Sequence, residues 1–153
     1  MNNLQLKAIR QGLGLEVSEA AELAGVQKRS FNYWEQGERQ VPSDVDFLFD
    51  FMASHYAMVL ERMIKDVERI TIYNKDDDTK PSRVSPTLPF FRTFESFQMK
   101  TECSKVAYWR IYQSVISQLI LLGKIVRLDD SKPIPDDFWI WSWLHGAFED
   151  ELH

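Results

Sequence analysis

The segment GVQKRSFNYWEQG, residues 25–37, constrains the fold more than any other part of this chain. A glycine stands at each end of it, and glycine commonly terminates helices, so the segment predicts a short helix from about Gln27 to Gln36. Each residue of a helix turns by about 100°. Phe31 and Trp34 then share one arc of the helix. The opposite arc carries cationic and polar residues, namely Lys28, Arg29, Asn32, Tyr33 and Gln36.

The two arcs of this helix favour different roles. Phe31 and Trp34 suit a small core. The opposite arc offers two cations, an amide and a phenol. Arginine and lysine can donate hydrogen bonds to O6 and N7 of guanine, and asparagine can pair with adenine, so this arc suits the major groove of DNA. For a helix taken alone, a solvated polar face is the simpler interpretation, and the neighbouring elements have to decide between the two.

Three further helices are expected in the first half of the chain. The run NLQLKAIRQ has apolar residues at near-helical spacing and predicts a helix that ends at Gly12 or Gly14. The run VSEAAELA predicts a second helix, stopped by Gly25. Pro42 and Ser43 suit the first turn of a long helix, whose apolar residues recur every three or four positions. Near its end, RITIY alternates and is also consistent with a short strand.

One composition shift divides the chain. The run NKDDDTKPSRVSPTLP, residues 74–89, has three prolines and an acidic triplet. Such a stretch is long for a loop inside a compact domain, so we interpret it as a linker or a flap. It separates an N-terminal part, residues 1–73, from a C-terminal part, residues 90–153.

The C-terminal part begins with phenylalanines and continues as a wide apolar stripe. Four phenylalanines lie within residues 90–97, and residues 104–123 predict a helix buried on more than one side. The run KIVRL could form a strand. The run DDFWIWSWLHGAF fits a helix or a strand, and Asp136 as an N-cap favours the helix. The expected fold class is therefore mainly α, and it allows a few short strands.

Charge and cysteine content exclude several classes of protein. The net charge is −5, which argues against a protein that coats nucleic acid without specificity. One cysteine, Cys103, excludes an intrachain disulfide and a zinc cluster built on cysteines. We find no signal peptide and no apolar run as long as a membrane span. The expected compartment is the cytoplasm, with no membrane association.

No constellation typical of an enzyme is present in the sequence. The three histidines, His55, His145 and His153, are scattered. His145 and Glu149 could share a helical face, but a zinc site needs a third ligand, so we expect no metal. The sequence has no activated nucleophile in a recognisable setting and no glycine-rich phosphate loop. We expect neither catalysis nor a cofactor.

Residues 6–49, LKAIRQGLGLEVSEAAELAGVQKRSFNYWEQGERQVPSDVDFLF, resemble the Cro and CI repressor-like, or xenobiotic-response-element, DNA-binding fold. The motifs that carry the resemblance are LGL before the second helix, ELAGV at the turn, and WEQGERQVP, which closes the third helix. It implies a lambda-repressor-like helix-turn-helix domain with residues 27–36 as the recognition helix. Two residues depart from the pattern: Glu16 replaces a usual Ser or Thr cap, and Val17 replaces a polar residue.

The resemblance also implies roles for individual residues. Those expected to face bases are Lys28, Arg29, Asn32 and Tyr33. Those expected to face phosphates are Ser18, Gln27, Arg39 and Gln40. Arg10 and Glu35 match a pair that ties the first helix to the third, above the Phe31 and Trp34 anchors.

The second half resembles a narrower group. The runs LPFFRTFESFQ and AYWRIYQSVISQL, residues 107–119 for the latter, are similar to the C-terminal region of YdiL-like bacterial proteins, which include helix-turn-helix regulators encoded beside anti-CRISPR genes. This resemblance implies a homodimer that binds an inverted repeat and represses its own operon. Dimerisation would use the helix over residues 104–123 or the tryptophan-rich tail. The helix residues expected at the interface are Trp109, Ile111, Tyr112, Val115 and Leu119.

Two functions follow as hypotheses. The first is a homodimeric transcriptional regulator that binds an inverted repeat in double-stranded DNA. The second is a protein-interaction module, for example an antitoxin-like partner protein, which the aromatic residues of 90–148 and the lack of net positive charge favour.

Overall fold

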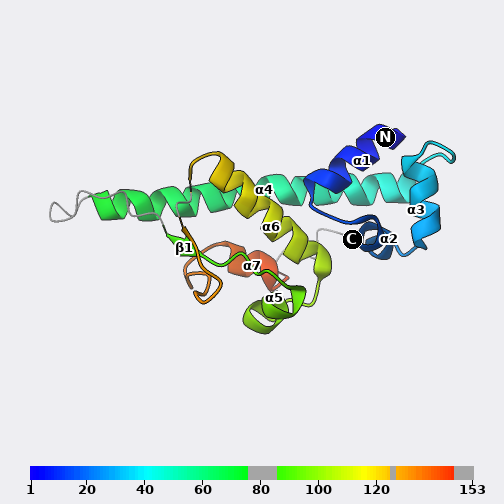
Figure 1. Ribbon diagram of the computed structural model, residues 1–153. Helices are drawn as coiled ribbons and strands as arrows, with labels where there is room; N and C mark the ends of the chain where they lie inside the picture. The colour runs from blue at the N-terminus through cyan, green and yellow to red at the C-terminus, as the bar shows by residue number, and fades with distance from the viewer. Residues whose placement is uncertain (76–85, 125–126, 147–153) are drawn as a thin grey trace. The chain divides into compact units, whose positions relative to one another are not determined.

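A computed structural model describes residues 1–75, 86–124 and 127–146, and these residues are mainly helical (Figure 1). The chain forms two compact units. The first comprises Met1–Ala57 with Lys105–Ser114, and the second comprises Met58–Ser104 with Val115–His153. Within the described residues the helices are α1 (Asn3–Gly12), α2 (Val17–Leu23), α3 (Lys28–Glu35), α4 (Ser43–Lys75), α5 (Phe94–Thr101), α6 (Val106–Leu121) and α7 (Ile140–Leu144).

In the first unit, α1 and α2 both contact α3, and α3 contacts the beginning of α4 through Phe31 and Phe49 (Figure 1). Local sequence explains where the short helices start and stop. The Asn2 side chain accepts a hydrogen bond from the Gln5 N–H, and the Gln5 side chain accepts one from the Asn2 N–H, each at 2.8 Å, which is a capping box. Gly25 and Gly37 follow α2 and α3 with positive φ, the backbone region that glycine adopts most readily.

The core of the first unit forms beneath α3. Phe31 is fully buried, and its ring centroid lies 5.7 Å from that of Trp34 and 5.6 Å from that of Phe49 on α4. The other buried apolar residues of this unit on α1, α2, the loops and α4 are Leu6, Leu13, Leu15, Ala20, Ala21, Val45 and Met52. Since one large buried apolar side chain contributes about 1.5–3 kcal/mol, this cluster fixes three helices that would be too short to persist alone.

The start of α6 also belongs to the first unit. The Ser114 hydroxyl donates to the Gly12 carbonyl at 2.6 Å. A Cβ on Gly14 would lie 3.2 Å from the Arg110 carbonyl oxygen, and Gly14 has φ +79°. Residues 105–114, far away in sequence, therefore pack directly against the loop that joins α1 to α2.

The second unit combines the end of α4 with α5, the end of α6, α7 and a small sheet. Strands β1 (Thr87–Leu88) and β2 (Arg127–Leu128) pair in parallel, with Thr87 opposite Arg127. Its core is mostly aliphatic and aromatic. The fully buried or nearly buried side chains include Val59, Met63, Val67, Phe91, Phe97, Val115, Ile116, Leu119, Ile134, Phe138, Ile140 and Trp143.

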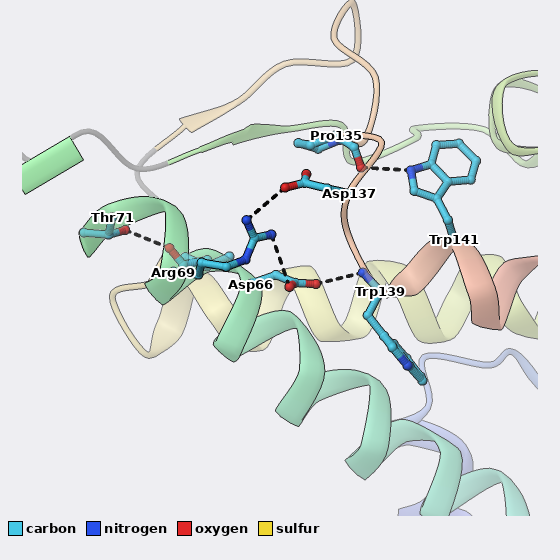
Figure 2. Close-up of polar contacts among 8 residues, drawn as sticks. Asp66, Arg69, Thr71, Pro135, Asp137, Trp139 and Trp141 are labelled. Atoms are coloured by element: carbon cyan, nitrogen blue, oxygen red, sulfur yellow. Dashed lines mark hydrogen bonds and ion pairs between the residues drawn. The ribbon is translucent and has the colours of Figure 1, made fainter. Parts of the chain in front are cut away.

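Polar contacts fix the segment before α7 to α4 (Figure 2). The Asp66 carboxylate accepts the Trp139 N–H at 2.9 Å. Arg69 donates to Asp137 at 2.9 Å and to Asp66 at 3.4 Å. Trp141 Nε1 donates to the Pro135 carbonyl at 2.9 Å. The Asp66–Trp139 and Arg69–Asp137 contacts join residues 73 and 68 positions apart and are tertiary in origin, whereas the Trp141–Pro135 bond is local to the segment that enters α7.

A loop cradle forms a second polar tie in the same unit. The Asp130 carboxylate accepts N–H bonds from Phe90 at 2.6 Å, Phe91 at 2.8 Å and Arg92 at 3.2 Å. Phe91 has φ +58°, a conformation unusual for a bulky residue. Burial would raise the pKa of Asp130, but the three N–H groups and Lys100 lower it below the usual range.

The structure decides the alternatives that the sequence left open. The run RITIY is helical, since α4 extends to Lys75. The run KIVRL contains strand β2, with residues 125 and 126 outside the described part. The tryptophan-rich run forms the helix α7, but the prediction of Asp136 as its N-cap is wrong. The N-cap is Trp139, because the Asp66 carboxylate from α4 takes the Trp139 N–H.

The expected fold class, mainly α with a few short strands, is confirmed. Helix α5 was not predicted, although Thr93 Oγ1 accepts the Ser96 N–H at 3.1 Å and caps it. Residues 76–85 of the expected linker lie outside the described part, and the division of the chain at 74–89 stays a prediction. No helix among the described residues is both long and apolar enough to cross a membrane.

Candidate nucleic-acid interface

Helix α3 is held from beneath by its two large apolar side chains. Phe31 is 0% exposed and Trp34 is 7% exposed. The helix runs from Lys28 to Glu35, with Gln27 and Gln36 at its caps. Because Phe31 and Trp34 point into the core, helical geometry turns the opposite side of α3 away from it. The orientation of the remaining α3 side chains is thus set by packing.

The four residues predicted to face bases occupy that outer side of α3. Lys28 and Arg29 are exposed, and Asn32 and Tyr33 are half-buried. Lys28 and Asn32 are four residues apart, as are Arg29 and Tyr33, so each pair is adjacent on the helix surface. The structure therefore brings these four side chains together along one edge, which we call the α3 edge.

Tyr33 joins two arginines of this region. Arg29 Nε donates to the Tyr33 hydroxyl at 2.7 Å. The Arg39 guanidinium lies 4.5 Å from the centroid of the Tyr33 ring, and that of Arg29 lies 5.5 Å from it. Arg39 lies in the loop after α3 and contacts Tyr33, so we count Arg39 as part of the α3 edge.

The α3 edge is cationic without compensation. Among the residues that the structure describes, no carboxylate lies within ion-pair distance of Lys28, Arg29 or Arg39. The chain as a whole has a net charge of −5. Although the chain is acidic overall, these exposed cations give the α3 edge a local positive charge, and such a charge attracts anions.

A buried ion pair fixes α3 to α1. Arg10 Nε donates to Glu35 Oε2 at 2.5 Å, and Arg10 Nη2 donates to Glu35 Oε1 at 3.0 Å. The side chains are 11% and 8% exposed. Arg10 Nη1 also donates to the Leu15 carbonyl at 2.9 Å. One guanidinium thus joins α1, the loop before α2 and the end of α3. Arg10 and Glu35 are the two residues that the resemblance to the Cro and CI fold pairs.

The residues predicted to face phosphates are all exposed. Ser18 lies in the first turn of α2, and Gln27 lies at the start of α3. Arg39 and Gln40 lie in the loop between α3 and α4. The N–H groups at a helix start favour anions, and two of the four residues lie at such ends. The structure keeps all four accessible, and Arg39 is the one that also contacts the α3 edge.

One contact in this region was missed by sequence reasoning. Arg110 Nε, on α6, lies 3.0 and 3.1 Å from the two carboxylate oxygens of Glu19 on α2. The Arg110 guanidinium also stacks 4.1 Å from the Trp109 ring centroid. Glu19 accepts the Glu16 N–H at 2.9 Å, so this glutamate caps α2 from its third position. Glu19 and Arg110 are 91 residues apart, and no local pattern could have paired them.

The five residues predicted for dimerisation are buried within one chain. Their exposed fractions are 7% or less. The residues are Trp109, Ile111, Tyr112, Val115 and Leu119. Burial of this kind gives them a core role and leaves almost no surface on them for a second copy. By contrast, Ile120, Leu121 and Leu122, at the end of α6, are 41%, 80% and 49% exposed.

The next feature is the placement of the side chains that could bind a metal ion. Residues 1–75, 86–124 and 127–146 contain no group of three His, Cys, Asp or Glu side chains that could hold an ion. His145 lies 3.2 Å from the Thr101 carbonyl and stacks on Trp141. Glu149 and His153 lie outside the described residues.

These features define a mainly helical protein that presents a short cationic helix edge on a buried aromatic anchor. The family described as Aca2/YdiL-like matches residues 1–125 of this chain. The Aca2 repressor of Pectobacterium phage ZF40 is 34% identical to it over 119 residues, which cover 75% of this chain and 89% of the relative. The chain therefore belongs to the Aca2/YdiL-like family, and the family expected from the sequence is confirmed.

Proposed function

We propose that this protein is a sequence-specific DNA-binding transcriptional regulator, and that α2, the turn after it and α3 form a helix-turn-helix of the Cro and CI type. Two short helices joined by a tight turn at Gly25 are the layout of that motif. In it, the second helix enters the major groove. The relative named as a repressor supports a regulatory role rather than an enzymatic one, and the proposal needs no cofactor.

The α3 edge is the single observation that carries this proposal. Lys28 and Arg29 are exposed cations with no carboxylate partner among the described residues, and Asn32 lies beside Lys28 on the helix. Arginine and lysine recognise O6 and N7 of guanine, and asparagine recognises adenine. We assign base contacts to Lys28, Arg29, Asn32 and Tyr33.

Phosphate contacts would orient this edge in the groove. Ser18, Gln27, Arg39 and Gln40 are exposed and lie at helix starts or in the loop after α3. Such contacts fix the register of a protein on the duplex and carry little sequence information. The acidic start of α2 is partly offset by Arg110, which engages Glu19, so α2 can approach phosphates with less repulsion.

We also propose that the protein acts in the cytoplasm as a homodimer on an inverted repeat and represses its own operon. A dimer of helix-turn-helix domains reads two half-sites about 34 Å apart, or one turn of DNA. Because the five predicted interface residues are buried in one chain, the contact between copies has to use exposed surface. Ile120, Leu121 and Leu122 offer apolar surface of that kind.

A gel-shift titration with the DNA upstream of the gene tests the proposal. The wild-type chain should bind this DNA in preference to a scrambled duplex of the same composition, and binding should weaken steeply with salt. Arg29→Ala and Lys28→Ala should each weaken specific binding by about 5- to 150-fold, since a good contact to a base edge is worth about 1–3 kcal/mol.

Lys65→Ala is the matched control. Lys65 is an exposed lysine on α4 that pairs with Glu61 at 3.0 Å, and its loss should leave binding nearly unchanged. If Arg29→Ala and Lys28→Ala bind as tightly as the wild type, α3 is not the reading helix. If the wild type binds no upstream DNA at low salt and purifies with a stoichiometric protein partner, the interaction-module hypothesis replaces this one.

A further inference from the structure

Tyr33 holds two guanidinium groups at one phenol. Arg29 Nε donates to its hydroxyl at 2.7 Å, and the Arg39 guanidinium lies 4.5 Å from its ring centroid. Tyr33 is half-buried, whereas both arginines are exposed. The most buried member of the cluster is thus the neutral Tyr33 side chain, which both guanidinium groups contact.

This arrangement attracts cations without neutralising them. The face of an aromatic ring attracts a guanidinium, and a phenol oxygen accepts its N–H bond, but neither carries a negative charge. Within the described residues no carboxylate pairs with Arg29 or Arg39. Two like charges held close together by a neutral group remain available to an anion or to a hydrogen-bond acceptor.

Donor accounting shows which edge of Arg29 remains available. A guanidinium has five N–H donors, and the Nε donor of Arg29 is engaged by Tyr33. The remaining donors are on Nη1 and Nη2, which form a parallel pair at the far end of the side chain. A bidentate contact to O6 and N7 of guanine needs such a pair. The Tyr33 hydroxyl accepts from Arg29 and still has its own proton to donate.

We propose that Tyr33 is a positioning residue for Arg29 and Arg39, which makes guanine recognition by Arg29 depend on the Tyr33 hydroxyl. This inference rests on the proposed DNA-binding function and deepens it. The phenol oxygen fixes Arg29 so that its Nη1 and Nη2 edge addresses one guanine in each half-site. The ring face holds Arg39 beside it, where a guanidinium meets the adjacent phosphate.

A direct reader and a positioning residue differ in where a substitution acts. If Tyr33 contacts its own base, its removal relaxes preference at that base. If Tyr33 positions Arg29, its removal relaxes preference at the base that Arg29 reads. Tyr33→Phe separates these roles because phenylalanine keeps the ring beneath Arg39 and removes only the hydroxyl that accepts Arg29 Nε.

The first measurement is a base-substitution scan of a bound duplex, selected from random DNA, by fluorescence anisotropy. In the wild type, replacing the guanine that Arg29 reads with adenine should lower the affinity. In Arg29→Ala the same replacement should have no effect, and this difference identifies the guanine. At that position, Tyr33→Phe should reduce the guanine preference about three- to tenfold, part of the range of a bidentate contact. The slope of affinity against salt should stay unchanged in Tyr33→Phe, and should fall by about one in Arg39→Ala. Tyr56→Phe, on α4, is the control and should alter neither quantity.

The second measurement needs no DNA. In the free wild-type chain, nitrogen-edited NMR should show slow solvent exchange of the Arg29 Nε proton, and Tyr33→Phe should restore fast exchange. Fast exchange in the wild type overturns the positioning role even where DNA binding is specific. An unchanged guanine preference in Tyr33→Phe, or an equal loss of affinity for all sequences, overturns it as well. If the wild type shows slow exchange but prefers no DNA sequence, the proposed function fails, and the positioning of Arg29 for guanine fails with it.

Discussion

The α3 edge and the corner between α4 and α7 differ in whether their cationic side chains form ion pairs with carboxylates. At the corner, Arg69 pairs with Asp137 and Asp66 (Figure 2). Lys124 in the same unit pairs with Glu68 at 2.9 Å. At the α3 edge, Lys28, Arg29 and Arg39 have no carboxylate partner within the described residues. The chain has more carboxylates than cations, so the absence of ion pairs at the α3 edge within the described residues supports the proposed contact with an anionic partner.

The same comparison separates buried from exposed ion pairs. Arg10 and Glu35 are 11% and 8% exposed, whereas Arg69 and Asp137 are 50% and 62% exposed. Water screens the exposed pair, so its net contribution to stability is small. The buried pair is different, because removal of one member leaves the other charge without compensation.

The largest expected effect is on the anchor of α3. Trp34→Ala should lower the free energy of unfolding by about 3–5 kcal/mol, since it removes a large buried side chain and leaves a cavity. Urea unfolding followed by circular dichroism measures this change. Trp139→Ala, a half-buried tryptophan of the second unit, is the comparison and should cost less. Equal losses of unfolding free energy in the two variants would show that Trp34 does not stabilise the fold more than a half-buried tryptophan does.

A smaller loss is expected from the buried pair. Glu35→Ala should lower the free energy of unfolding by about 3 kcal/mol, because Arg10 would remain buried without a carboxylate. The double variant Arg10→Met and Glu35→Leu should recover part of the loss in the same urea titration, because it removes the orphaned charge. No recovery in the double variant would mean that the pair stabilises the fold by its own attraction.

The Asp130 cradle should give an intermediate and pH-dependent effect. Asp130→Asn should lower the free energy of unfolding by about 2 kcal/mol at pH 7, since hydrogen bonds to a charged acceptor are worth about 1.5–3 kcal/mol. The pKa of Asp130 is lowered in the folded chain. Its stabilisation is therefore complete above the unfolded pKa of about 3.9 and is lost as the pH falls through the lower folded pKa.

Urea titrations of the wild type and Asp130→Asn between pH 2 and pH 7 check this prediction. The two curves of unfolding free energy against pH should run parallel above about pH 5 and converge in acid. A constant gap between the two curves down to the lowest pH would contradict the assigned role of the carboxylate.

The smallest effect is expected at the corner. Arg69→Ala removes contacts to Asp66 and Asp137, and because water screens this exposed group, the loss of unfolding free energy should be smaller than for Trp34→Ala, Glu35→Ala and Asp130→Asn. Raising the salt concentration should shrink the difference between Arg69→Ala and the wild type further. A loss as large as that of Glu35→Ala would remove the distinction between exposed and buried pairs in this protein.

Local chemistry explains what the sequence could predict. The bounds of α1, α2 and α3 follow from a cap at Asn2 and from glycines at Gly25 and Gly37, all within a few residues of the helices concerned. The two faces of α3 follow from helical periodicity, with Phe31 and Trp34 on the core side. Features that depend on residues close together in the chain, such as helix ends and helix faces, can therefore be predicted from the sequence.

Long-range contacts explain what the sequence could not predict. The start of α7 depends on Asp66, which is 73 residues before Trp139, and this contact displaced the expected cap at Asp136. The Asp130 cradle acts on residues 38 to 40 positions earlier. The stripe on α6 correctly indicated burial, but an apolar stripe does not reveal whether it faces its own chain or a second copy.

The most direct test of the α3 edge compares two triple variants with equal charge. Lys28→Ala, Arg29→Ala and Arg39→Ala remove three cations from the edge, and Lys65→Ala, Arg69→Ala and Lys124→Ala remove three paired cations elsewhere, so both variants change the net charge from −5 to −8. Affinity for the upstream DNA is measured by anisotropy as a function of salt. The edge variant should lose specific binding, while the paired-cation variant should bind with nearly the wild-type affinity and salt slope. Equal losses in both variants would show that overall charge governs binding, and would contradict the account.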